Sequence, residues 1–219
     1  MTDVAAFDFD GTISRRDTLL RFLAKAAGPS RFTATCARLG LLGARRRIPL
    51  GDRDRTKEHM IELLLTGRRE SDLRALGERY ARDLLTGDRL RPEMIERVHE
   101  HRRAGHLTVI VSASLVYYLD PIAEALSIDG VIGVEPEVAA GTLTGRLARP
   151  NVRADEKAVR LAEWLGLVAD GPDRPRLHAY GNSSGDHALL EMADVRWWLG
   201  RPGKVPAGSM PFGRSTPLE

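Results

Sequence analysis

The first dozen residues constrain the fold of this chain more than any other segment. Residues 4–9 are apolar and β-capable apart from Asp8, and they run directly into an Asp-Gly-Thr sequence at 10–12. This pattern predicts a short buried strand that ends in a tight turn. Asp8 and Asp10 then lie at the carboxyl end of a strand, which is where open parallel sheets bind their ligands.

Strand-like and helix-like segments alternate after residue 90. The expected strands are 106–111, 131–134, 177–180 and 196–199, and the expected helices are 92–104, a helix around 117–122, 155–165 and 186–192. Residues 135–148 alternate around Ala140-Gly141, as is typical of a β-hairpin. The alternation of strands and helices predicts a doubly wound parallel sheet of the α/β class.

The segment between the first two strands has a helical pattern instead. Its expected helices are 17–27, 31–43, 54–66 and 71–85. We therefore expect a helical cap domain, residues 15–90, inserted directly after the first strand into an α/β core formed by 1–14 and 91–200. Residues 201–219 are rich in Gly and Pro, so we expect an irregular tail there.

Composition favours a reduced compartment. The 219 residues are 42% hydrophobic, which is enough to bury the core of one sizeable domain with an insertion. The single cysteine, Cys36, cannot form an intramolecular disulfide, and we expect it to be buried and inert. The N-terminus has no basic leader before its first apolar run. We therefore expect a cytoplasmic protein.

The charge pattern indicates a solvated surface. The net charge of +3 and the pI near 9.3 are mildly basic, but the arginines are interleaved with acids, so we expect no nucleic-acid partner. Residues 32–44 are apolar and end in Arg45, Arg46 and Arg47, but this run is too short for a transmembrane segment. Burial inside the cap is the favoured interpretation, and peripheral membrane contact is the alternative.

Three predicted strands end in polar side chains that should converge. Asp8, Ser112 and Asn182 each follow such a strand. Carboxylates at positions i and i+2 can supply a nucleophile beside a proton carrier, and Gly11 lets the loop curl around a small anion. Taken alone, the same residues could also form an ordinary turn or a calcium-binding carboxylate pair.

Four motifs in chain order strengthen the first interpretation. They are DFDGT at 8–12, SAS at 112–114, Lys157 at a helix start and GNSSGD at 181–186. In order and spacing the chain resembles the haloacid dehalogenase superfamily, and within it the phosphoserine-phosphatase-like branch with a helical cap between the first two motifs. The resemblance covers roughly residues 4–200 and implies a hydrolase that acts on phosphate esters.

The resemblance assigns a role to each motif. Asp8 is implied to be the nucleophile that forms an aspartyl phosphate, and Asp10 to protonate the leaving oxygen and later deprotonate water. Ser112 and the amide of Ala113 would bind the phosphoryl oxygens, and Lys157 would neutralise them. Lys157 is one of only four lysines in the chain, so few other residues could take this role, although a solvated helix-start lysine is the alternative.

The resemblance also implies a Mg²⁺ site made by Asp8, Asp10 and the last motif. The family usually begins that motif with an aspartate, but this chain has Asn182 there. An amide oxygen can bind Mg²⁺ without adding charge. Asp186 matches the second acid of the motif, and it could act through a water, hold Lys157, bind the metal directly or cap the following helix.

Other side chains are less well defined by their motifs. Ser114 is either a second substrate contact or a helix cap. Asp17 falls where phosphoserine phosphatases carry an acid that reads the substrate amine, yet its neighbours Arg15 and Arg16 do not suggest an amino-acid pocket. The six histidines have no metal-ligand spacing with a cysteine, so no zinc site is expected.

We therefore predict a Mg²⁺-dependent phosphomonoester phosphatase that acts on a small phosphorylated metabolite. Three alternatives stay open at this point. The aspartyl phosphate could transfer its phosphoryl group to an alcohol, the substrate could be a lipid phosphate, or Asn182 could mark a weakly active, phosphate-binding regulatory protein.

Overall fold

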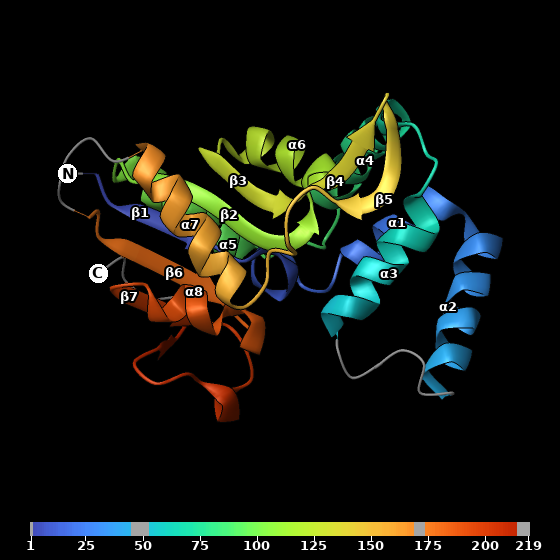
Figure 1. The fold of residues 1–219 in the computed structure, drawn as a ribbon. Coiled ribbons are helices and arrows are strands. Elements are labelled where there is room, and N and C mark those ends of the chain that lie inside the picture. The colour runs from blue at the N-terminus through green and yellow to red at the C-terminus, as the bar shows by residue number, and fades with distance from the viewer. Residues whose placement is uncertain (1, 45–52, 169–173, 214–219) are drawn as a thin grey trace.

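A six-stranded, fully parallel sheet forms the centre of the protein, as seen in a computed structural model that describes residues 2–44, 53–168 and 174–213 (Figure 1). Its strand order is β3 (Gly130–Val134), β2 (Leu107–Leu115), β1 (Val4–Phe7), β6 (Leu177–Gly181), β7 (Val195–Trp198) and β8 (Met210–Pro211). Every residue of β1 and β6 is buried, because each strand has neighbours on both sides and helices cover both faces.

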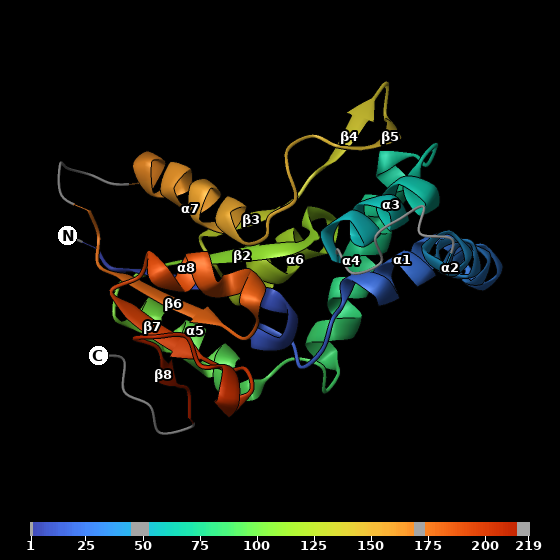
Figure 2. The ribbon, with the colours of Figure 1, turned by 60° about the horizontal axis from the view of Figure 1, so that its bottom comes forward.

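The core helices form two layers. The helices α5 (Pro92–Arg103) and α6 (Val116–Leu126) cover one face of the sheet, and α7 (Asp155–Val168) and α8 (His187–Glu191) cover the other (Figure 2). The predicted doubly wound α/β fold is thereby confirmed. Its first and second strands are neighbours in the sheet although the chain between them is long, so that segment can fold apart from the sheet.

In its described part, that segment forms four helices: α1 (Leu19–Ala27), α2 (Pro29–Ala44), α3 (Arg53–Leu65) and α4 (Glu70–Thr86). The predicted hairpin is also present, as β4 (Pro136–Ala139) and β5 (Thr142–Leu147). It lies beside α3 and bonds to the α3–α4 turn, where Gly67 N–H donates to the carbonyl of Leu143 at 2.9 Å. Within the described residues, no helix is long and apolar enough to cross a membrane.

Two sequence predictions about local structure were wrong. The predicted irregular tail contains a short helical turn, η3 (Pro202–Lys204), and the strand β8, which is held because the Phe212 ring packs near Tyr180 and Trp197. A two-residue strand is too short to give a periodic pattern. Cys36 is exposed rather than buried. Thr35 and Leu39 form the buried side of α2, and Cys36 lies outside it.

Helix α7 also runs past Gly166, where we had expected it to end. The predicted basic cluster at 45–47 and the end of the tail, 214–219, lie outside the described residues.

The helical segment docks on the core where α4 meets α6. A Cβ atom on Gly77 of α4 would lie 2.0 Å from the backbone oxygen of Tyr117, so the two helix backbones are closer here than any side chain would permit. One turn further along α4, the Tyr80 ring meets Tyr118 edge-on, with 5.4 Å between centroids. This contact fixes how the helical segment sits above the sheet.

Gly77→Ala should therefore destabilise the protein. The added methyl must push α4 away from a backbone atom that cannot rotate aside, and such overpacking costs about 1–3 kcal/mol of unfolding free energy. Gly40→Ala in the exposed part of α2 is the matched control, because its Cβ meets nothing within 4 Å. It should stabilise the protein by up to about 1 kcal/mol. Urea unfolding measures both, and equal stabilities would contradict the proposed contact.

Candidate active site

The loop after β1 directs two carboxylates into one cavity. The Asp8 amide continues the sheet ladder by donating to the carbonyl of Tyr180 at 2.9 Å, so the Asp8 side chain leaves the sheet at its carboxyl edge. The chain then forms the irregular turn η1 (Phe9–Ile13), in which Gly11 has φ +87°. Thr12 Oγ1 donates back to Asp8 Oδ2 at 3.1 Å and fixes that carboxylate.

The cavity at this edge has a volume of about 530 Å³. The predicted site residues that line it are Asp8, Asp10, Gly11, Asp17, Ser112, Ala113, Lys157, Asn182 and Asp186. Ser114 is not among the lining residues. The convergence of strand ends that the sequence predicted is therefore present, because β1, β2 and β6 are parallel neighbours.

A buried lysine lies between two carboxylates. Lys157 Nζ donates to Asp8 Oδ1 at 2.6 Å and to Asp186 Oδ1 at 2.7 Å, and its side chain is only 2% exposed. Three charges this deep are tolerated because each is paired and hydrogen-bonded. The alternative of a solvated helix-start lysine does not match this burial.

The pKa values of the three groups are shifted in different ways. Burial, and then the charge of Asp186, raises the pKa of Asp8 to about 7, although Lys157 acts in the opposite direction. Burial alone would also raise the pKa of Asp186, but Lys157 and two backbone amides hold it below its ordinary value. The pKa of Lys157 is raised to about 12, because the two carboxylates outweigh its burial. As the pH falls, Asp8 therefore takes up a proton before Asp186 does.

Asp186 is fully engaged by its neighbours. Its Oδ2 accepts hydrogen bonds from the amides of Asn182 and Ser183, at 3.1 and 2.9 Å, and from Ser183 Oγ at 2.9 Å. Ser183 and Asp186 also form a capping box at the turn η2 (Ser184–Asp186) that leads into α8. Of the roles left open by the sequence, the contacts display the holding of Lys157; Asp186 caps the turn η2, as the partner of Ser183, and makes no side-chain cap to α8 itself.

Asn182 has an oxygen that fits a metal ion. Its Oδ1 is buried and has no hydrogen-bond partner among the described residues. A Cβ on Gly11 would lie 1.9 Å from Asn182 Nδ2, so only glycine lets the first loop and the last motif meet. An orphaned amide oxygen in a cavity with two carboxylates is a donor set of the all-oxygen kind that Mg²⁺ prefers.

Asp10 is held by the start of the helical segment. Its Oδ1 accepts from Thr18 N at 2.8 Å and Thr18 Oγ1 at 2.6 Å, and its Oδ2 accepts from Ser114 Oγ at 2.6 Å. Burial, and then the charge of Asp17, raises the pKa of Asp10 above its ordinary value despite these bonds. Ser114 therefore orients Asp10. It lies within β2 and neither caps α6 nor lines the cavity, so both roles expected from the sequence were wrong.

The cavity also contains side chains that sequence reasoning missed. Lys57 reaches it from α3 and lies 3.2 Å from Asp17 Oδ2, and Arg153 reaches it from the loop before α7. Arg15 and Arg16, noted in the sequence as neighbours of Asp17, line it as well. No motif marks Lys57 or Arg153, because both come from segments outside the four short motifs.

A model of the haloacid dehalogenase-like hydrolase family matches residues 5–191 of this chain. The chain belongs to this family. It is 33% identical to Protein CicA of Caulobacter vibrioides over 211 residues, which cover 91% of this chain and 88% of CicA. It is 30% identical to a phosphoserine phosphatase of Idiomarina loihiensis over 131 residues, which cover 60% of this chain and 55% of that enzyme.

Solved structures share the fold of this chain. A protein of unknown function from Bordetella pertussis Tohama I superposes with a TM-score of 0.77 at 27% identity, covering 93% of both chains. A substrate-bound phosphoserine phosphatase has the same fold, with a TM-score of 0.63 at 16% identity over 92% of this chain and 88% of that chain. The predicted family, its phosphoserine-phosphatase-like branch and a hydrolase of the phosphatase type are thereby confirmed at the level of the family.

Lys157→Met should make the stability of the metal-free protein fall more steeply with pH than that of wild type. Without the ammonium, the pKa of Asp8 rises above about 7, while the unfolded value stays near 3.8. A carboxyl whose folded pKa is raised favours the protonated folded state, so stability falls as pH rises from 3.8 toward the folded pKa. We expect a loss of about 3 kcal/mol or more near pH ~8, where the carboxylates are unprotonated, and a smaller loss near pH ~5.5.

Urea unfolding in EDTA at both pH values measures this difference. Lys25→Met is the matched control, because the Lys25–Asp83 pair is half exposed on both sides. Its loss should stay below about 1 kcal/mol at either pH. A pH-independent loss in Lys157→Met would contradict the shared-lysine arrangement.

Proposed function

We propose that this protein is a Mg²⁺-dependent phosphomonoester phosphatase that acts through an aspartyl phosphate on Asp8. The observation that carries the proposal is the Asp8–Lys157–Asp186 contact, with Asp10 in the same cavity. It supplies a nucleophile, a fixed positive charge and a proton carrier around one small volume. The substrate we propose is a small phosphorylated metabolite in the cytoplasm.

In the first step, a carboxylate oxygen of Asp8 attacks phosphorus while the bond from phosphorus to the ester oxygen breaks. Asp10 gives its proton to that leaving oxygen, and its raised pKa supports its carrying a proton at the start. In the second step, Asp10 takes a proton from water, the water oxygen attacks phosphorus, and Asp8 leaves as a carboxylate. Thr18 and Ser114 keep Asp10 in one orientation for both transfers.

Lys157 neutralises phosphoryl oxygens during both steps. Asp186 does not touch the substrate in this proposal and acts by positioning Lys157. Ser112 and the Ala113 amide lie within β2, in the part beyond its pairing with β1, and would bind the other phosphoryl oxygens. The catalytic centre therefore draws on three strand ends and the first turn of α7.

The residues that would hold Mg²⁺ are Asp8, Asp10 through its backbone carbonyl, and Asn182 through its orphaned Oδ1. When bound, the ion supplies positive charge that offsets the approach of a phosphate dianion to two carboxylates. Asp186 keeps its hydrogen bonds to Asn182 and Ser183, and these bonds fix the loop that carries the amide ligand.

The cavity supports an anionic rather than a zwitterionic substrate. Asp17, the acid expected to read a substrate amine, lies 3.2 Å from Lys57 and is already paired. Arg15, Arg16 and Arg153 also line the cavity. A volume of about 530 Å³ accommodates a small metabolite. We propose a phosphate ester without a free amine beside the phosphate.

Asp8→Asn should abolish turnover without unfolding the protein, because an amide of the same size cannot form the phosphoenzyme.

Asp10→Asn should slow hydrolysis of an alkyl phosphate by about 100-fold or more, and slow an activated aryl phosphate much less, because only the alkoxide needs a proton. Steady-state rates on both substrates measure this difference. Equal losses on the two substrates would argue against the acid role of Asp10.

Asn182→Asp should lower the Mg²⁺ concentration for half-maximal activity, because it adds a charged oxygen ligand to the proposed metal site. The maximal rate need not rise, since the extra charge also repels a phosphate dianion. The matched control is Asn151→Asp, which adds the same charge at the other asparagine of the chain, outside the cavity lining. If the Mg²⁺ concentration for half-maximal activity is unchanged in Asn182→Asp, Asn182 does not bind the metal.

A further inference from the structure

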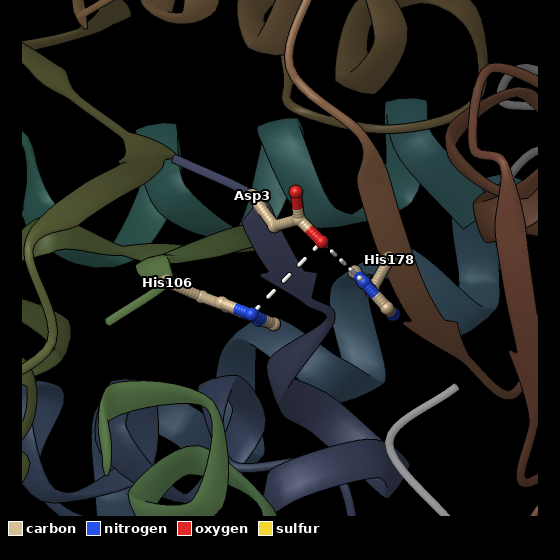
Figure 3. Close-up of side chains that lie close together, drawn as sticks. All are labelled: Asp3, His106 and His178. Atoms are coloured by element: carbon tan, nitrogen blue, oxygen red, sulfur yellow. Dashed lines mark hydrogen bonds and ion pairs between the residues drawn. The ribbon is translucent and has the colours of Figure 1, made fainter. Parts of the chain in front are cut away.

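We propose a second metal site, suited to Zn²⁺ or a similar transition metal, at the amino-terminal edge of the sheet. Its ligands are Asp3, His106 and His178, whose side chains point toward one another (Figure 3). This edge is opposite the one that carries the candidate active site, so the site is separate from the proposed Mg²⁺ centre. It does not depend on the proposed function.

Strand register brings these three residues together. Asp3 and His106 directly precede the paired strands β1 and β2, in which Val4 is opposite Leu107. His178 is the second residue of β6, opposite Ala5 of β1. The three residues are far apart in the sequence, and none has a cysteine at zinc-finger spacing, which is why the sequence predicted no zinc site.

The distances between the ligand atoms are close to those of a metal site, although the His178–Asp3 contact is also a hydrogen bond. Asp3 Oδ2 lies 3.4 Å from His178 Nε2 and 3.9 Å from His106 Nε2, and all three ligand atoms lie within 4.8 Å of one another. Nitrogen and oxygen ligands about 2.0–2.1 Å from a tetrahedral Zn²⁺ are about 3.3 Å apart. Small side-chain movements close the remaining gap, whereas 3.9 Å is too long for a hydrogen bond.

A second observation concerns the ring nitrogen of His178 that faces away from Asp3. His178 is 98% buried as a side chain, since only 2% is exposed, and its Nδ1 has no hydrogen-bond partner among the described residues. The ring directs Nε2 to Asp3 while leaving a buried nitrogen unpaired. That arrangement costs free energy unless Nε2 makes a strong bond in return.

His106 has the outer partner expected of a metal ligand. Its Nδ1 lies 2.9 Å from Nδ1 of the fully buried His101, whose Nε2 lies 2.8 Å from the Tyr180 hydroxyl. If His101 donates to Tyr180, its Nδ1 accepts from His106, and the lone pair of His106 is then on Nε2, facing Asp3. Metal-binding histidines commonly donate their second N–H in this way.

The ligand types select the ion. Two neutral imidazoles and one carboxylate suit Zn²⁺, Ni²⁺ or Cu²⁺ better than Mg²⁺, which prefers oxygen ligands. The side chains of His106 and Asp3 are 18% and 27% exposed, so an ion can enter from solvent, and a water can complete four ligands.

The experiment uses the full chain, stripped with EDTA and returned to buffer with millimolar Mg²⁺ to occupy the proposed catalytic centre. Zn²⁺ binding is measured by calorimetry, and Co²⁺ is added as a spectroscopic probe of nitrogen ligands. We expect one equivalent of Zn²⁺ to bind in the presence of Mg²⁺, and His106→Ala or His178→Ala to weaken that binding by at least about 10-fold. His99→Ala, on α5 and outside the cluster, is the control and should bind as wild type does.

Circular dichroism verifies that each variant is folded. If buried His178→Ala fails to fold, the more exposed His106→Ala decides the question. The proposal is overturned if wild type binds no Zn²⁺ while millimolar Mg²⁺ is present. It is equally overturned if folded His106→Ala binds Zn²⁺ as tightly as His99→Ala. Neither result bears on Asp8 chemistry, which is assayed separately.

Discussion

The site depends on one buried ammonium group. Asp8 and Asp186 come from the ends of adjacent strands, and both carboxylates are removed from water. Two such charges would repel each other and pay a large desolvation cost without a cation between them. Lys157 supplies that cation from the first turn of α7, at 2.6 and 2.7 Å. The position of α7 over the sheet is therefore set by charge as well as by its apolar face.

A second network joins the site to the helical segment. Thr18, directly before α1, bonds to Asp10 with both its amide and its hydroxyl, and the hydroxyl also lies 3.0 Å from the Tyr118 hydroxyl of α6. The Tyr80 hydroxyl of α4 donates to the Thr18 carbonyl at 2.9 Å. Movement of α1 or α4 would therefore disturb the carboxylate proposed to carry the proton. The proton transfer proposed for Asp10 therefore depends on hydrogen bonds that also hold the helical segment.

The features of the fold and the candidate site that the sequence predicted are those encoded by short local patterns. The strands predicted before Asp8, Ser112 and Asn182 are short and continuous in sequence, so the sequence predicted both the fold and the convergence of these three residues. The contact of Gly11 with Asn182 depends on how two distant loops meet, and no local pattern encodes it. Lys57 was missed for the same reason, because its place in the cavity follows from how α3 packs above the sheet.

The two edges of the sheet are linked by the strands themselves. Asp8, Ser112 and Asn182 lie near the carboxyl ends of β1, β2 and β6, and Asp3, His106 and His178 lie near the amino ends of the same strands. An ion held by those three side chains would tie the same strands at the opposite end. A close-packed interior transmits strain, so fixing one end of these strands restricts the spacing at the other. A metal there would act on the catalytic centre only by holding its scaffold.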